Sequence, residues 1–111
     1  METKTAVIAL AALAQESRLA VFRALVVAGP EGLPAGKISE LTGIAPSSLS
    51  FHLKELSHAA MVSSRQSGRY VIYTANFSTM SALLGFLTEN CCGGASCSPR
   101  EPLIEFGRVD L

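Results

Sequence analysis

Apolar side chains recur at helical spacing along the first third of the chain. Residues 4–14 are rich in alanine and leucine, which favour a helix, and contain no helix-breaking residue. Ser17 is predicted to cap a second helix, in which Leu19, Phe22 and Val26 lie on one face. A Gly-Pro dipeptide then ends this second pattern.

Two further helices are predicted on either side of a glycine. The first begins near Pro34, carries Ile38 and Leu41 on one face, and ends with Gly43 in the C-cap position. Pro46 begins the second, whose apolar residues are spaced by four, three and four. These residues are Leu49, Leu53, Leu56 and Ala60, and the opposite faces are predicted to carry Ser47, Ser48, Ser50, His52 and Lys54. Two helices joined by a tight turn are typical of a helix-turn-helix.

The remaining pattern predicts a hairpin and a last helix. Alternating residues indicate two strands, 61–66 and 69–75, around a turn at Ser67-Gly68. Asn76 or Ser78 would cap a fifth helix that runs directly into the first cysteine. Its apolar residues are Met80, Leu83, Leu84 and Leu87. The predicted fold class is mainly α with a small β-hairpin, a winged helix-turn-helix of four helices, two strands and a fifth helix.

Composition favours a partner that covers apolar surface. Hydrophobic residues make up 49% of the 111 residues and charged residues 16%, against about a quarter in typical domains. A chain of this length forms one small domain with much surface for its volume. A homodimer is the simplest way to hide the excess apolar area.

The charges are unevenly spread along a chain whose formal net charge is zero. Residues 34–76 carry four basic and two acidic side chains, whereas residues 77–111 carry two basic and four acidic ones. Any face that binds nucleic acid is therefore expected in the middle of the chain.

The side chains suited to DNA gather on the predicted fourth helix and the hairpin. Serines can donate to phosphates and base edges, and their small size lets a helix approach the major groove, while basic residues suit phosphates. The candidates are Lys37, Ser47, Ser48, Ser50, His52, Lys54, Arg65 and Arg69. The alternatives are solvated helix positions for the serines, protection of a sheet edge for the arginines, and a backbone carbonyl partner for the histidine.

All three cysteines lie within seven residues, at Cys91, Cys92 and Cys97. A disulfide between adjacent cysteines closes a strained ring, and any pairing leaves one thiol over. Thiolates select soft or borderline ions, among them trivalent arsenic and antimony. Three thiolates complete the pyramidal site of trivalent arsenic but leave zinc one ligand short, and Glu89 or Glu101 would be needed for zinc or cadmium.

Three segments resemble the ArsR/SmtB family of metal-responsive repressors: SRLAVFRAL, KISELTGIAPSSLSFHLKEL and SGRYVIYTAN. The resemblance implies a homodimer, built from the first and last helices, that sits on double-stranded operator DNA and leaves it on binding an ion. Many arsenite repressors of the family carry a Cys-x-Cys pair before the recognition helix, but residues 36–41 contain no cysteine. Zinc-sensing members carry Asp and His ligands along the last helix, and residues 81–89 contain neither. The chain is therefore similar to members with a C-terminal cysteine site, which respond to arsenite, antimonite or methylated arsenicals.

These observations predict a repressor and not an enzyme, because no phosphate loop and no Cys–His arrangement is present in the sequence. We expect residues 1–90 to form the DNA-binding and dimerisation domain and residues 91–111 a tail with the inducer site. We expect As(III) or Sb(III) as the inducer and no required cofactor. A thiol redox sensor and a tail without a role are the alternatives.

The apolar run at residues 5–14 is too short to span a membrane, and Glu2 offsets Lys4 in what would be the charged region of a signal peptide. We therefore expect a cytoplasmic protein without a membrane partner, whose thiols stay reduced.

Overall fold

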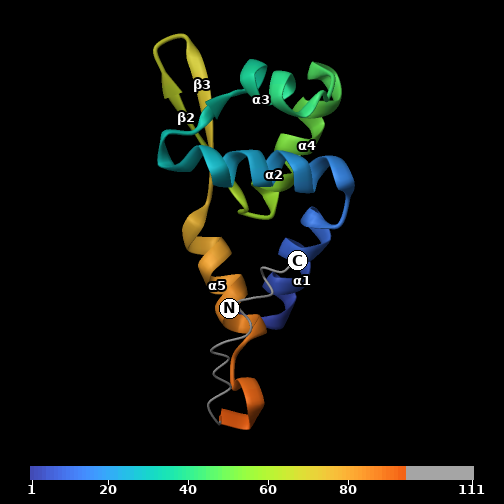
Figure 1. Ribbon diagram of the computed structural model, residues 1–111, viewed down its shortest axis with the longest axis vertical. Helices are drawn as coiled ribbons and strands as arrows, with labels where there is room; N and C mark the ends of the chain where they lie inside the picture. The colour runs from blue at the N-terminus through green and yellow to red at the C-terminus, as the bar shows by residue number, and fades with distance from the viewer. Residues whose placement is uncertain (95–111) are drawn as a thin grey trace, which may run out of the picture.

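Five α-helices and a three-stranded sheet follow one another in the computed structural model, which describes residues 1–94. The helices are α1 (Thr3–Leu13), α2 (Glu16–Ala28), α3 (Ala35–Thr42), α4 (Pro46–His58) and α5 (Phe77–Leu87). The strands are β1 (Leu33–Pro34), β2 (Val62–Ser67) and β3 (Tyr70–Ala75), and two short 3-10 helices are η1 (Gly29–Glu31) and η2 (Cys91–Gly94). Helices α2, α3 and α4 and the sheet form one end of the molecule, while α1 and α5 lie side by side at the other (Figure 1). The predicted winged helix-turn-helix and its element order are confirmed.

Side-chain caps set the starts of two helices. The Oε1 atom of Gln15 accepts a hydrogen bond from the backbone N–H of Arg18 at 2.9 Å, so α2 begins earlier than predicted. Ser17 lies inside the helix, and its predicted capping role is wrong. At α5, the Oδ1 atom of Asn76 accepts from the backbone N–H of Thr79 at 3.2 Å, which confirms the first of the two predicted caps.

The turn between α3 and α4 is closed by local hydrogen bonds. Gly43 adopts a left-handed conformation with φ 76° and ψ 8°, as predicted for a C-cap. The hydroxyl of Ser39 donates to the backbone carbonyl of Ile44 at 2.6 Å, across the same turn. Ile38 is buried as expected, but Leu41 is exposed, because α3 is covered by its neighbours on one narrow face only.

The buried stripe of α4 follows the predicted spacing up to its last member. Leu49, Leu53 and Leu56 are buried, but Ala59 and not Ala60 continues the stripe. Ala60 has a left-handed φ of 60°, which ends the helix, and the next backbone N–H, that of Met61, donates to the carbonyl of Leu56 at 2.9 Å.

The sheet has the strand order β1-β3-β2 and is antiparallel throughout. Ser67 pairs with Tyr70, so the two-residue turn is Gly68-Arg69 and not the predicted Ser67-Gly68. The third strand, β1, was not predicted, because a segment of two residues carries no alternation. Its Leu33 pairs with Tyr73 and packs β1 against the inner strand of the wing.

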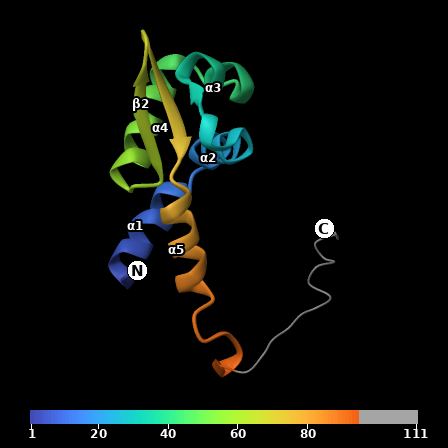
Figure 2. The ribbon, with the colours of Figure 1, turned by 90° about the vertical axis from the view of Figure 1, so that its left-hand side faces the viewer.

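The core lies between α2, α3, α4 and the base of the sheet (Figure 2). Its largest fully buried side chains are Val21, Leu25, Ile38, Leu49, Leu56 and Met61. In α2 the buried face carries Val21 and Phe22, while Leu19 is exposed. The buried face is therefore shifted by about one residue from the predicted one. Helix α1 contributes only alanines to the core, and α5 contributes only Leu83 among its residues. Val7, Ile8 and Leu10 of α1 and Leu84 and Leu87 of α5 are left exposed.

Within the described residues, no single helix has the length and apolar character needed to cross a membrane. The segments Thr3–Leu13 and Glu16–Glu31 meet that criterion only as a pair, bent by 100°, and by length and composition alone.

Candidate functional site

Helix α4 presents a polar, small-residue surface on the side opposite its buried stripe. Ser47, Ser48, Ser50 and Lys54 are all exposed, which confirms the predicted outward face. Pro46 lies in the first turn of the helix. Proline is well tolerated there, because the backbone N–H that it lacks would have no partner within the helix. Three serine hydroxyls near the first turn of one exposed helix can approach a nucleic-acid groove closely.

His52 does not belong to that surface. Its side chain is 9% exposed, and its Nδ1 atom accepts a hydrogen bond from Nε of Arg18 on α2 at 3.4 Å. The prediction that His52 lies on the exposed face with the serines is wrong. Residue 52 falls three positions after Leu49 and four before Leu56, so helical geometry turns it onto the buried stripe.

Phe51 is a residue of this surface that the sequence pattern did not single out. It is 54% exposed, and the guanidinium carbon of Arg18 lies 5.7 Å from its ring centroid. The ring of His52 meets it edge to face, with centroids 5.8 Å apart and an interplanar angle of 62°. A large apolar residue outside the apolar stripe and among serines was the available signal.

The basic residues of the wing and of α3 occupy three different settings. Arg69 lies in the exposed turn at the tip of the hairpin. Arg65 is exposed on the edge strand β2, and its Nη2 atom donates to the backbone carbonyl of Glu31 at 3.0 Å. Lys37 forms an ion pair with Glu40 at 3.1 Å on the exposed surface of α3. Arg69 and Lys54 therefore carry the least constrained cations among the predicted DNA-binding residues.

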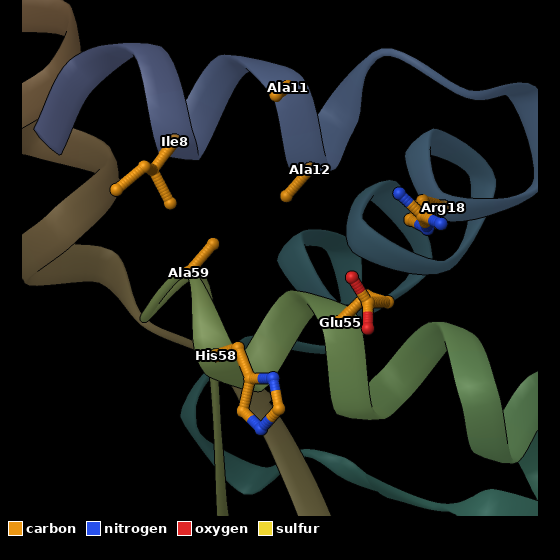
Figure 3. A pocket seen from close by; sticks show the side chains of 7 residues that line it. All are labelled: Ile8, Ala11, Ala12, Arg18, Glu55, His58 and Ala59. Carbon is orange, nitrogen blue, oxygen red and sulfur yellow. The ribbon is translucent and has the colours of Figure 1, made fainter. Parts of the chain in front are cut away.

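A hollow of about 260 Å³ opens between α1 and α4, next to the start of α2 (Figure 3). Ile8, Ala11 and Ala12 line it from α1, and Glu55, His58 and Ala59 line it from α4, with Arg18 at one end. His58 is exposed in the last turn of α4, at the rim of this hollow. Across residues 1–94, no three side chains of the His, Cys, Asp and Glu types come together around one position suited to a metal ion.

The cysteine segment follows α5 after a short break. The prediction that the last helix runs directly into Cys91 is wrong, because α5 ends at Leu87. The hydroxyl of Thr88 donates to the carbonyl of Leu84 at 2.8 Å at this end of the helix. Cys91 and Cys92 lie in η2, with their Sγ atoms 3.7 Å apart. Cys97 lies outside the described residues, so the three-thiol site stays a prediction.

Known helix-turn-helix proteins match this chain over the segments that build the site. A model of a helix-turn-helix domain matches residues 13–65. YceK of Bacillus subtilis, an uncharacterized HTH-type transcriptional regulator, is 36% identical over 77 residues, which cover 68% of this chain and 76% of YceK. The chain belongs to the family of HTH-type transcriptional regulators.

Solved structures share the fold of this HTH-type regulator. An ArsR-like transcriptional regulator from Rhodococcus sp. RHA1 has a TM-score of 0.70 at 20% identity and covers 97% of this chain and 96% of its own. The homodimeric winged helix-turn-helix DNA-binding domain of Mb0332 from Mycobacterium bovis has a TM-score of 0.61 at 20% identity, with coverages of 84% and 86%. The family is a class of DNA-binding proteins and not of enzymes, in agreement with the prediction from sequence.

Proposed function

We propose that this regulator is a homodimeric repressor that binds operator DNA and releases it when trivalent arsenic binds Cys91, Cys92 and Cys97. The observation that carries the DNA-binding half is the exposed serine surface of α4 beside the basic wing. Helix α4 enters the major groove, where Ser47, Ser48 and Ser50 reach phosphates and base edges. Lys54 and Arg69 bind phosphates, which supplies affinity without sequence choice.

Dimerisation through α1 and α5 is supported by the apolar side chains that these helices leave uncovered. Val7 and Ile8 of α1 and Leu84 and Leu87 of α5 are each more than half exposed, and the two helices lie side by side (Figure 2). Exposed apolar side chains gathered on two neighbouring helices favour an interaction surface on a small protein. Mb0332, which shares the fold, is homodimeric, and a two-fold dimer would present two recognition helices to two half-sites.

The arsenic site is supported by the position and chemistry of the cysteines. Cys91 and Cys92 come four and five residues after the end of α5, so an ion bound there acts at the edge of the dimer surface. Binding would draw Cys97 onto the other two thiolates and change the end of α5. The change would shift the two recognition helices away from their half-site spacing, with a loss of DNA affinity of about tenfold to a hundredfold.

The experiment is an arsenite titration of the protein–operator complex, followed by fluorescence anisotropy of the labelled duplex. Wild type should release DNA, whereas Cys91→Ser and Cys92→Ser should stay bound at the same arsenite concentration. Antimonite and methylarsenite are titrated in parallel, and Cys97→Ser separates three-thiol from two-thiol binding. Release that is unchanged in the Cys91 and Cys92 variants would contradict the proposed inducer site.

X-ray absorption at the arsenic edge provides a direct check of the ligands. Three sulfur neighbours per arsenic, at equal occupancy in each protomer, are expected for the full site. Oxygen in place of a sulfur neighbour would instead contradict binding by three thiolates. The proposal places the protein in the cytoplasm, where thiols stay reduced.

A thiol redox sensor on the same DNA-binding domain is the second candidate. The observation in its favour is that Cys92 is disulfide-bonded and that its Sγ atom lies 3.7 Å from the Sγ atom of Cys91. Clustered thiols oxidised by peroxide would release DNA without any ion. Mass spectrometry of the released protein separates the two, because oxidation removes hydrogens from the thiols whereas arsenic binding adds the mass of arsenic.

A further inference from the structure

Phe51 stands out on the recognition helix because it is the one large apolar side chain on the surface that carries Ser47, Ser48, Ser50 and Lys54, within the described residues. Its position is not part of the buried stripe, and more than half of its side chain faces solvent. Leaving an aromatic ring in water forfeits the stabilisation that its burial would give. An aromatic residue kept exposed on a binding surface is best explained by an apolar group of the ligand that covers it.

The ring is also held in place before any ligand arrives. The guanidinium of Arg18 lies over it at 5.7 Å from the ring centroid, a cation–π arrangement. The imidazole of His52 packs against it edge to face, and that imidazole is itself buried and bonded to Arg18 at 3.4 Å. Two neighbours, one from α2 and one from α4, therefore limit the rotation of Phe51, and binding loses less side-chain entropy.

The major groove of DNA contains one apolar group that such a ring would recognise. Adenine, guanine and cytosine present hydrogen-bond donors and acceptors there, whereas thymine also presents a C5-methyl group. A ring on the serine surface cannot hydrogen-bond to a base edge, but it can cover this methyl group. The neighbouring serines are short enough to let the helix approach to van der Waals distance.

We propose that Phe51 reads a thymine methyl group in each operator half-site, with Arg18 as the residue that positions its ring. This inference rests on the proposed DNA-binding function and adds to it a sequence preference at one base pair per half-site. Phe51 supplies base choice, while Lys54 and Arg69 supply affinity that does not depend on sequence.

The test removes the methyl group alone. Duplexes that bind the wild-type protein are first selected from a random pool, and each thymine of the selected site is then replaced, one at a time, by deoxyuridine. Wild type should lose about threefold to tenfold in affinity at one thymine per half-site. Phe51→Ala should bind the thymine and uracil duplexes equally well, and Phe51→Leu should keep part of the difference, because leucine is apolar but smaller.

The matched control is Val27→Ala, which truncates an apolar residue that is 86% exposed on α2. This variant should discriminate thymine from uracil as wild type does, and circular dichroism confirms that each variant is folded. A thymine preference that persists undiminished in both Phe51 variants would overturn the inference while leaving the proposed function intact. If wild type selects no duplex at all, the proposed function fails first, and the role of Phe51 fails with it.

Discussion

The buried Nδ1 atom of His52 accepts a hydrogen bond from Nε of Arg18, 3.4 Å away, and so joins the recognition helix α4 to α2. Because α2 packs in the core, the bond helps to fix the orientation of α4 and of the adjacent Phe51 ring. The pair is thus part of the framework behind the candidate DNA surface.

A double-mutant cycle measures this link. His52→Leu and Arg18→Met each remove one partner while keeping apolar volume, and each should lower the free energy of unfolding by about 1 kcal/mol. The double variant should lose less than the sum, with a coupling of about 0.5–1 kcal/mol from urea denaturation. Strictly additive losses would mean that the bond contributes nothing.

Gly32 is expected to tolerate no side chain. Its φ is +71°, and an added Cβ would meet the backbone carbonyl of Tyr73 and the methyl groups of Thr74 and Ile72. Gly32→Ala should therefore lower the free energy of unfolding by about 3 kcal/mol, through backbone strain and displacement of β3. The control is Gly36→Ala in α3, where nothing lies within 4 Å of the added Cβ, and which should raise stability by up to about 1 kcal/mol. Thermal denaturation of both variants separates a local steric effect from a general effect of alanine.

Asn76 and Ser78 differ in their expected contribution to α5, although both were candidate caps. Asn76→Ala removes the acceptor of the Thr79 N–H and should cost about 1 kcal/mol of stability. Ser78→Ala changes an exposed residue inside the helix and should cost nothing measurable. Equal losses in chemical denaturation would show that the cap is not the source of the effect.

Leu84→Glu should dissociate the proposed dimer. The side chain is 56% exposed in the protomer, and a buried carboxylate at the interface of two copies would lose its hydration. Sedimentation at micromolar concentration should show a monomer, with weaker binding to a two-half-site duplex. Val27→Glu places the same charge on an exposed apolar position of α2 and should leave the dimer intact. If Leu84→Glu remains dimeric, α5 is not the interface.

Phosphate contacts should appear in the salt dependence of DNA binding. Arg69→Ala or Lys54→Ala should lower the slope of log affinity against log salt by about 1.8 for a dimer that loses two contacts. Arg65→Ala should change the slope less, because its guanidinium already donates to the carbonyl of Glu31. Arg23→Ala, exposed on α2, is the control. A slope that is the same in all four variants would remove the wing and Lys54 from the interface.

Much of the fold could be predicted because its signals are local. The left-handed turn at Gly43 follows from the conformational freedom of glycine, and the start of α4 follows from Pro46. The stripe of Leu49, Leu53 and Leu56 follows from helical spacing, and it places the serines outside by default. The exposed part of the candidate site was therefore predictable, down to the individual hydroxyl-bearing residues.

Other features depend on contacts between segments far apart in the chain. The strand β1 exists because Leu33 and Pro34 meet Tyr73 and Ile72, about forty residues later. The burial of His52 follows from its position on the helix. The cost of burying its polar ring is reduced by the hydrogen bond from Arg18, 34 positions away. Phe51 lies outside the apolar stripe, but its exposure and its contacts with Arg18 and His52 are visible only in the fold.

By itself, the sequence determined the helices, the turn between α3 and α4, the outward serines and the clustering of three thiols, because spacing and backbone preference act between near neighbours. Only the tertiary structure decided that His52 bonds to Arg18, that Phe51 stands exposed beside both, and that α1 and α5 lie side by side. Those outcomes depend on which distant side chains meet. Burial and hydrogen bonding across the fold, and not local periodicity, select them.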